Sequence, residues 1–222
     1  MRKLAFLLVG LGLGGSVMAV EEPKFEVLTK EVTQEGTFEL RKYAPFIVAE
    51  TWVEGDLDAA SSKGFRAIAD YIFGNNQAAG AGDKAGAKIA MTAPVTLEAG
   101  AAKPQKIAMT APVTVEPNAT MSGTGQWRVH FVMPSEYTLA TLPKPNNDAV
   151  QLREVPAKTF AVVTYSGFNT QSRIKEETDK LGNWMQGKSL NARGNALLAR
   201  YDPPWTLPLF RRNEVHFEVE KP

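Results

Sequence analysis

The feature that most limits the possible folds of this chain is an internal repeat. Residues 38–55 read FELRKYAPFIVAETWVEG, and residues 150–167 read VQLREVPAKTFAVVTYSG. Leu40-Arg41 matches Leu152-Arg153 and Gly55 matches Gly167, an offset of 112 residues in both cases. Because each copy holds two apolar runs on either side of a proline, each copy predicts a strand, a turn and a second strand.

A helix is predicted after each copy, and a further strand closes each half. Residues 56–74 begin with Asp56 and Asp58, either of which can cap a helix, and carry apolar residues at helical spacing as far as Gly74. Residues 168–187 do the same, with Ile174, Thr178, Leu181 and Trp184/Met185 forming the apolar stripe. The tripeptide VHF then recurs at 129–131 and 215–217. Such a unit, used twice, predicts an α+β fold in which an antiparallel sheet carries two helices.

The first half is longer than the second by about 26 residues, since the offset falls to 86 at VHF. Residues 75–87 and 98–105 are rich in Ala and Gly, which predicts mobile loops. The nonapeptide KIAMTAPVT occurs at 88–96 and again at 106–114, with the alternation of a strand. Its prolines, Pro94 and Pro112, predict an edge strand or a bulge in each copy. Residues 143–148 are expected to link the halves, 25–142 and 149–221.

The first residues are expected to be a targeting segment. A basic start at Arg2-Lys3, an uncharged apolar run and a small-residue site ending at Ala19 are typical of a secretory signal peptide. The alternative, a membrane anchor, is disfavoured because the run has 17 residues, four of them Gly, where about 20 strongly apolar residues are needed. We therefore expect residues 1–19 to be removed and residues 20–222 to form one exported, periplasmic domain with no membrane attachment.

Composition excludes several function classes. Removing 1–19 changes the formal net charge from +1 to −1, which disfavours a nucleic-acid partner. The chain has no Cys and two His, so thiolate chemistry is excluded and any histidine chemistry must use His130 or His216. Alternation places both histidines on the polar side of a strand. Surface histidines are the favoured interpretation, and a metal-ligand role, with His130 ahead, is the alternative.

No catalytic constellation stands out. The chain has no G-x-S-x-G, H-E-x-x-H or phosphate-binding glycine motif. Glu176, Glu177 and Asp179 could suggest paired carboxylates, but helical spacing predicts that they form a solvated polar face. We therefore expect a protein that is not an enzyme.

The methionines and aromatic residues leave two alternatives open. Met91, Met109, Met121, Met133 and Met185, with Trp127, Trp184 and several Phe, could line a pocket for a flat hydrophobic ligand, or could be ordinary core. Spacing does not separate the two.

Several motifs closely resemble the SOUL haem-binding family and fall in the order that this family has. They are LREVPAKTFAVVTYSG (152–167), the paired KIAMTAPVT segments, VMPSEYTLATLPKPN (132–146) and ARYDPPWTLPLFRRNEVHFE (199–218). The resemblance runs from about Phe25 to Lys221. It implies an α+β fold in which two pseudo-two-fold related halves build a distorted antiparallel β-barrel or sheet with two main helices.

The resemblance also implies a ligand and a site. The ligand would be haem or another tetrapyrrole, held in an apolar groove beside the first helix and the C-terminal strands. Cations would pair with its carboxylates. The residues that match are Lys63, Phe65, Arg66, Ala69, Phe73, Met109, Tyr201, Trp205, Phe210 and Arg211. For Arg211 and Arg212 the alternative is a structural role in the turn. Because the stretch from Phe25 to Trp52 has no histidine, apolar contact is expected to hold the ligand more than the iron does.

Together with the predicted signal peptide, the resemblance implies an exported, non-enzymatic haem or tetrapyrrole carrier or buffer. Two alternatives are kept: a binding module for another amphipathic small molecule, and an enzyme that processes tetrapyrroles. The sequence leaves the oligomeric state open.

Overall fold

The computed structural model describes residues 21–78, 86–99, 125–202 and 205–220. The predicted signal peptide, the second KIAMTAPVT copy, Met109 and Met121 lie outside these residues. The elements in chain order are β1 (Phe25–Thr33), β2 (Gly36–Tyr43), β3 (Phe46–Gly55), α1 (Leu57–Ile72), β4 (Asn76–Gln77), β5 (Val95–Ala99), β6 (Gly125–Val132), β7 (Lys144–Pro145), β8 (Gln151–Val155), β9 (Lys158–Tyr165), α2 (Gln171–Gly187), β10 (Ala192–Arg200), the 3₁₀ turn η1 (Pro208–Phe210) and β11 (Asn213–Val219).

Nine strands form one antiparallel sheet in the order β1-β2-β9-β11-β10-β5-β6-β3-β8. From β2 to β8 the order is symmetric about its centre. Each strand of the first half has a counterpart at the same distance from the centre: β2 matches β8, β3 matches β9, β6 matches β11, and β5 matches β10. Leu97 of β5 pairs with Leu198 of β10 at the centre of this pattern. The predicted α+β class with two helices is confirmed, and the described strands form an open, distorted sheet. The common origin of the two halves stays a prediction.

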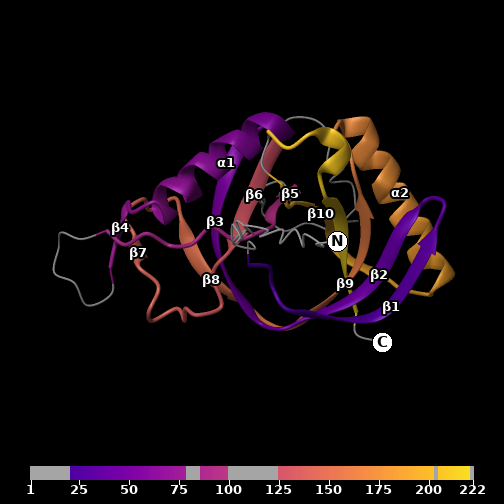
Figure 1. Ribbon diagram of the computed structural model, residues 1–222, viewed down its shortest axis with the longest axis horizontal. Coiled ribbons are helices and arrows are strands. Elements are labelled where there is room, and N and C mark those ends of the chain that lie inside the picture. The colour runs from indigo at the N-terminus through magenta and orange to yellow at the C-terminus, as the bar shows by residue number, and fades with distance from the viewer. Residues whose placement is uncertain (1–20, 79–85, 100–124, 203–204, 221–222) are drawn as a thin grey trace, which may run out of the picture.

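Both helices lie on one side of the sheet, and the yellow segment after β10 passes between them (Figure 1). α1 packs on β3 and β6, and α2 packs on β9 and β11. Asp56 is the cap of α1, because its side chain accepts a hydrogen bond from the Ala59 N–H at 2.8 Å. The matched glycines have a common backbone role: Gly55 has φ +145° and Gly167 has φ +106°, conformations that favour glycine where the chain turns from strand towards helix.

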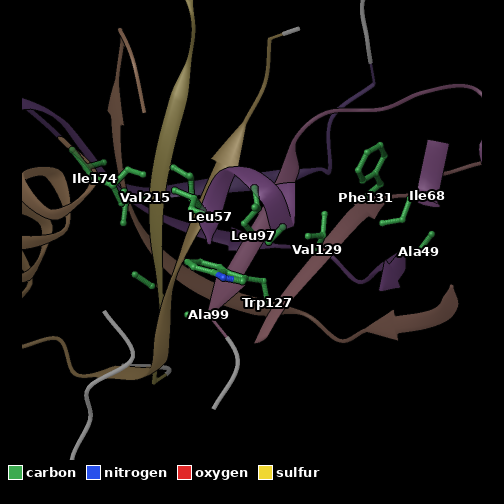
Figure 2. Packing of buried hydrophobic residues seen from close by; sticks show 14 of the residues in the cluster. Ala49, Leu57, Ile68, Leu97, Ala99, Trp127, Val129, Phe131, Ile174 and Val215 are labelled. Carbon is green, nitrogen blue, oxygen red and sulfur yellow. The ribbon is translucent and has the colours of Figure 1, made fainter. Parts of the chain in front are cut away.

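The main core lies between the helices and the sheet (Figure 2). Trp127, Val129 and Phe131 of β6 point into it, as their alternation predicts. Gly64 lets α1 approach β6 closely, since a Cβ at this position would lie 2.5 Å from Val129 Cγ2. Met133 and Met185 are buried core residues, which decides for core packing at these two positions.

The expectation of two surface histidines is wrong. His130 and His216 do lie on the sheet face opposite the core side chains, but their exposed fractions are 8% and 6%. The second face is covered because strands from both halves contribute side chains to it, including a small cluster of Tyr43, Phe160 and Val162. Alternation correctly separates the two faces, but it does not show that both are buried.

Three local expectations are also corrected. Residues 88–94 of the first KIAMTAPVT copy form no strand; β5 begins after Pro94 and is central in the sheet. The predicted loops include ordered strand residues, since Asn76–Gln77 pairs with β7 and Glu98-Ala99 ends β5. Glu177 is 1% exposed, so it does not lie on a solvated face. Its carboxylate is instead paired with Arg173 and Lys180 of the same helix.

Within the residues that the structure describes, no helix is both long enough and apolar enough to cross a membrane.

Candidate functional site

Five large apolar side chains are exposed around the segment between the two helices. We call Phe168, Trp205, Leu207, Leu209 and Phe210 the loop surface; their exposed fractions run from 63% to 83%. Phe168 is held beside the others because the Gly167 N–H donates to the Pro208 carbonyl at 2.9 Å. Contiguous exposed apolar groups of this size mark binding sites more often than ordinary surface. Trp205 and Phe210 were predicted from sequence.

Two guanidinium groups lie next to the loop surface. The Arg211 Nε donates to the Thr206 carbonyl at 2.7 Å, and its guanidinium lies 5.8 Å from the centre of the Phe168 ring. Arg200 reaches α1, where its Nη1 donates to Ser61 Oγ at 3.1 Å. The Arg200 Nε is buried with no hydrogen-bond partner among the described residues. Burial lowers the pKa of Arg200 against the opposing charge of Asp58, and the charge of Arg211 adds a smaller effect in the same direction as burial. A carboxylate here would therefore meet one unpaired buried donor and two positive charges.

The predicted residues on α1 do not all meet this surface. Because Arg200 contacts Ser61 and lies 3.8 Å from Asp58, the loop begins at the N-terminal end of α1. Phe73 caps the other end, roughly 22 Å away at about 1.5 Å per residue. Phe65 is 37% exposed and its ring packs 5.4 Å from that of Phe131, while Ala69 is buried in the core.

The remaining predicted cations also have defined places. The Lys63 Nζ donates to the Glu54 carbonyl at 3.0 Å, and Arg66 is exposed. Arg212 pairs with Glu214 and Glu22 and stacks on Tyr201. These contacts give it the structural role that was the alternative to ligand binding.

Tyr201 faces the opposite side from Arg200. Its hydroxyl donates to Glu214 Oε2 at 2.7 Å. Burial, together with the charge of Glu214, raises the pKa of Tyr201, so that the hydroxyl keeps its proton. Tyr201 thus lines a different feature, a pocket on the second face of the sheet, which we call the strand-face pocket.

The strand-face pocket has a volume of about 130 Å³ and holds both histidines of the chain. Four cationic side chains, Arg128, Arg153, Lys158 and Arg193, line it with Glu98 and Glu218. Burial, with the charges of Arg128 and Arg153 next in effect, lowers the pKa of His130 to about 3. Pockets for drug-sized ligands span about 300–1,000 Å³, so this one is too small to enclose a tetrapyrrole.

A larger pocket of about 430 Å³ lies at the turn between β2 and β3. Its charged lining is Glu21, Glu22, Lys24 and Glu154, so acids outnumber bases three to one. This balance disfavours a ligand with two carboxylates.

A buried charge network joins the strand-face pocket to the sheet. Glu214 is 0% exposed and accepts from Arg41, Tyr201 and Arg212, while His216 Nε2 lies 2.8 Å from its Oε2. Burial alone would raise the pKa of Glu214, but the hydrogen bond from His216 and the charges of His216 and Arg41 hold it well below its usual range. Within the described parts of the chain, no cluster of three His, Asp or Glu side chains could hold a metal ion.

Sequence reasoning missed four residues of the loop surface and its surroundings: Phe168, Arg200, Leu207 and Leu209. Leu207 and Leu209 lie on either side of Pro208 in the TLPLF run, where the proline signals a turn. Arg200 gave no such signal, because its proximity to α1 depends on the sheet bringing β10 beside the other half.

Comparisons with known proteins give a consistent assignment. The family profile described as SOUL heme-binding protein matches residues 20–103 and 97–218. Heme-binding protein 2 of Mus musculus is 28% identical over 93% of this chain and 90% of the mouse protein, and the Homo sapiens protein is 28% identical over 93% and 89%.

Solved structures share the fold at low identity. The C-terminal domain of EcmrR has a TM-score of 0.54 at 14% identity, covering 83% of this chain and 98% of that domain. A hydrolase from Listeria innocua has a TM-score of 0.52 at 11% identity, covering 82% and 91%.

Proposed function

The chain belongs to the SOUL heme-binding protein family, and from this membership we propose that it is a non-enzymatic protein that binds haem or a related tetrapyrrole, and from the signal-peptide pattern of residues 1–19 that it is exported. In this proposal it serves as a carrier or buffer. Its relatives are named as binding proteins, which supports a non-enzymatic role.

The loop surface is the proposed contact for the ligand. A tetrapyrrole of the haem type offers a flat apolar face and two carboxylates. The observation that carries the assignment is the combination of five exposed apolar side chains with the buried Arg200 Nε, which lacks a partner among the described residues. Arg200 and Arg211 would hold carboxylates, and Phe168, Trp205 and Phe210 would cover the ring.

Bound haem would supply an iron centre, but this chain holds the ligand chiefly by apolar contact in our proposal. Both histidines line the strand-face pocket rather than the loop surface. The iron therefore has no histidine ligand at the loop surface, and iron-free protoporphyrin should bind about as tightly as haemin.

The test is a titration of haemin and of protoporphyrin into residues 20–222, followed by the Soret band and by tryptophan quenching. We expect Trp205→Ala and Phe210→Ala each to weaken binding about tenfold or more, because each loses the burial of a large aromatic side chain. Arg200→Gln should weaken haemin binding and leave the fold intact.

Two controls locate the site. Val32→Ala removes an exposed apolar group on β1 and should change nothing. Phe73→Ala separates two sites: an unchanged affinity supports the loop surface, and a tenfold loss would place the ligand along α1 instead. Absence of any Soret shift or quenching at micromolar ligand would refute tetrapyrrole binding and favour another amphipathic ligand.

Export and the non-enzymatic role need separate measurements. Expression of the full chain in a bacterium with a periplasm, then fractionation, should place the protein in the periplasm. The spectrum of the bound ligand should stay unchanged over hours. A spectrum that changes with time because the ligand is converted to product would favour a tetrapyrrole-processing enzyme.

A further inference from the structure

The strand-face pocket contains two buried nitrogen atoms that the proposed function does not use. Arg128 Nε and His130 Nδ1 have no hydrogen-bond partner among the described residues, and both side chains line the pocket. They are two residues apart on β6, so they lie on the same face of the strand. Leaving such groups unpaired is costly, and buried polar atoms nearly always have a partner. Two orphaned atoms in one pocket point to a ligand.

Neighbouring ion pairs hold the cations of the pocket in place. Arg128 pairs with Glu98 through Nη2, and its Nη1 lies 3.9 Å from Glu50, so neither carboxylate is hydrogen-bonded to its Nε. Arg153 pairs with Glu50 at 2.7 Å, Lys158 with Glu218 at 2.5 Å, and Arg193 with Glu220 at 2.5 Å. Each of the four cations is thus paired with a carboxylate, and the Arg128 Nε–H remains as a charged donor without a partner among the described residues, which favours an acceptor that carries negative charge.

His130 can donate a hydrogen bond to a ligand while its ring is uncharged. Its pKa near 3 keeps the ring neutral at ordinary pH, because the ring is buried beside Arg128 and Arg153. A neutral imidazole with the proton on Nδ1 is a single donor. With the Nε–H of Arg128, two residues away on β6, this tautomer would offer two N–H groups to the oxygen atoms of one ligand.

We infer that the strand-face pocket binds a small oxyanion of the carboxylate or phosphate class, which accepts hydrogen bonds from Arg128 Nε and His130 Nδ1. The volume of about 130 Å³ sets the size of the ligand. A single buried water needs a cavity of about 10–15 Å³, so this pocket has room for an ion of several heavy atoms, such as acetate or inorganic phosphate. This site is separate from the loop surface and does not depend on tetrapyrrole binding.

The test uses nitrogen NMR of the two histidine rings and the arginine Nε groups in residues 20–222. Sodium acetate and sodium phosphate are titrated separately against sodium chloride at constant ionic strength. We expect a saturable shift at His130 and at Arg128 Nε with acetate, phosphate or both, and none with chloride. The comparison of acetate with phosphate identifies which class binds.

Matched variants show whether the two nitrogens carry the binding. Arg128→Lys keeps the charge but loses the Nε donor, and His130→Phe removes the ring nitrogens; each should weaken binding about tenfold or more. Arg173→Lys is the control and should leave binding unchanged, since Arg173 lies on α2 outside the pocket lining and pairs with Glu176 and Glu177.

Two results would overturn the inference. One is a wild-type titration in which the two signals do not shift, shift linearly with concentration, or shift equally with chloride. This result needs no variant, so it counts even if a variant fails to fold. The other is a crystal structure grown with acetate or phosphate in which water alone contacts both nitrogens.

Discussion

Glu214→Gln is the sharpest probe of the buried charge network. The carboxylate is fully buried, and each of its oxygens accepts from three donors. Oε1 accepts from Arg41 Nη2, Thr164 and Arg212, and Oε2 accepts from Arg41 Nη1, Tyr201 and His216. Whichever way a glutamine lies, its NH₂ group therefore faces Arg41, which cannot accept a hydrogen bond.

The expected loss is large because the variant leaves a charge buried. Arg41 is 4% exposed, and without Glu214 it keeps Glu39 as its carboxylate partner, at 2.6 Å. Removing one partner of a buried ion pair costs about 3–5 kcal/mol. We expect the free energy of unfolding to fall by this amount in urea denaturation at pH 7, followed by tryptophan fluorescence and circular dichroism. The matched control is Glu26→Gln on the exposed edge strand β1, with a change within about 0.5 kcal/mol.

Acid titration gives a second, independent readout. The folded pKa of Glu214 is depressed, so its contribution to stability is present above the ordinary carboxyl value of 4.5 and is lost as the pH falls below it. The variant should lose less stability than the wild type between pH 5 and 3. Some loss will remain, because Lys30 and Arg41 lower the pKa of Glu39 against the effect of its burial. A loss below about 1 kcal/mol at pH 7, with an unchanged acid slope, would refute the reasoning.

Three further outcomes follow from the structure. Gly64→Ala should destabilise the protein by about 1–3 kcal/mol, since its Cβ would lie 2.5 Å from Val129 Cγ2, and Val129→Ala in the same chain should recover part of the loss in urea denaturation. His130 should stay neutral in the folded state down to about pH 3 in NMR titration; because the unfolded chain takes up this proton near its ordinary pKa of 6.5, the contribution of His130 to stability should fall as the pH drops from 6.5 towards 3. Finally, the N-terminal residue of the exported protein should be Val20, and an intact Met1 in the periplasmic fraction would contradict cleavage after Ala19.

The sequence by itself determined the elements that the two halves share and which of their side chains meet the core. Strand–turn–strand, helix and closing strand could be predicted in both halves because alternation and helical spacing are local patterns. The VHF strands are the clearest case, since Val129 and Phe131 do pack under α1. The exposed aromatics Trp205 and Phe210 of the candidate site also came from sequence, through the family motif.

Only the tertiary structure decided what lies on the second face of the sheet and what surrounds the loop surface. Spacing places His130 and His216 opposite the core, but their burial depends on side chains from both halves that are distant in sequence. Arg200 and Tyr201 show the same limit. They are adjacent in the chain, yet Arg200 reaches Ser61 beside the loop surface, whereas Tyr201 lines the strand-face pocket and donates to the buried Glu214. The local pattern fixes the direction of a side chain, whereas the pairing of distant strands fixes what it meets.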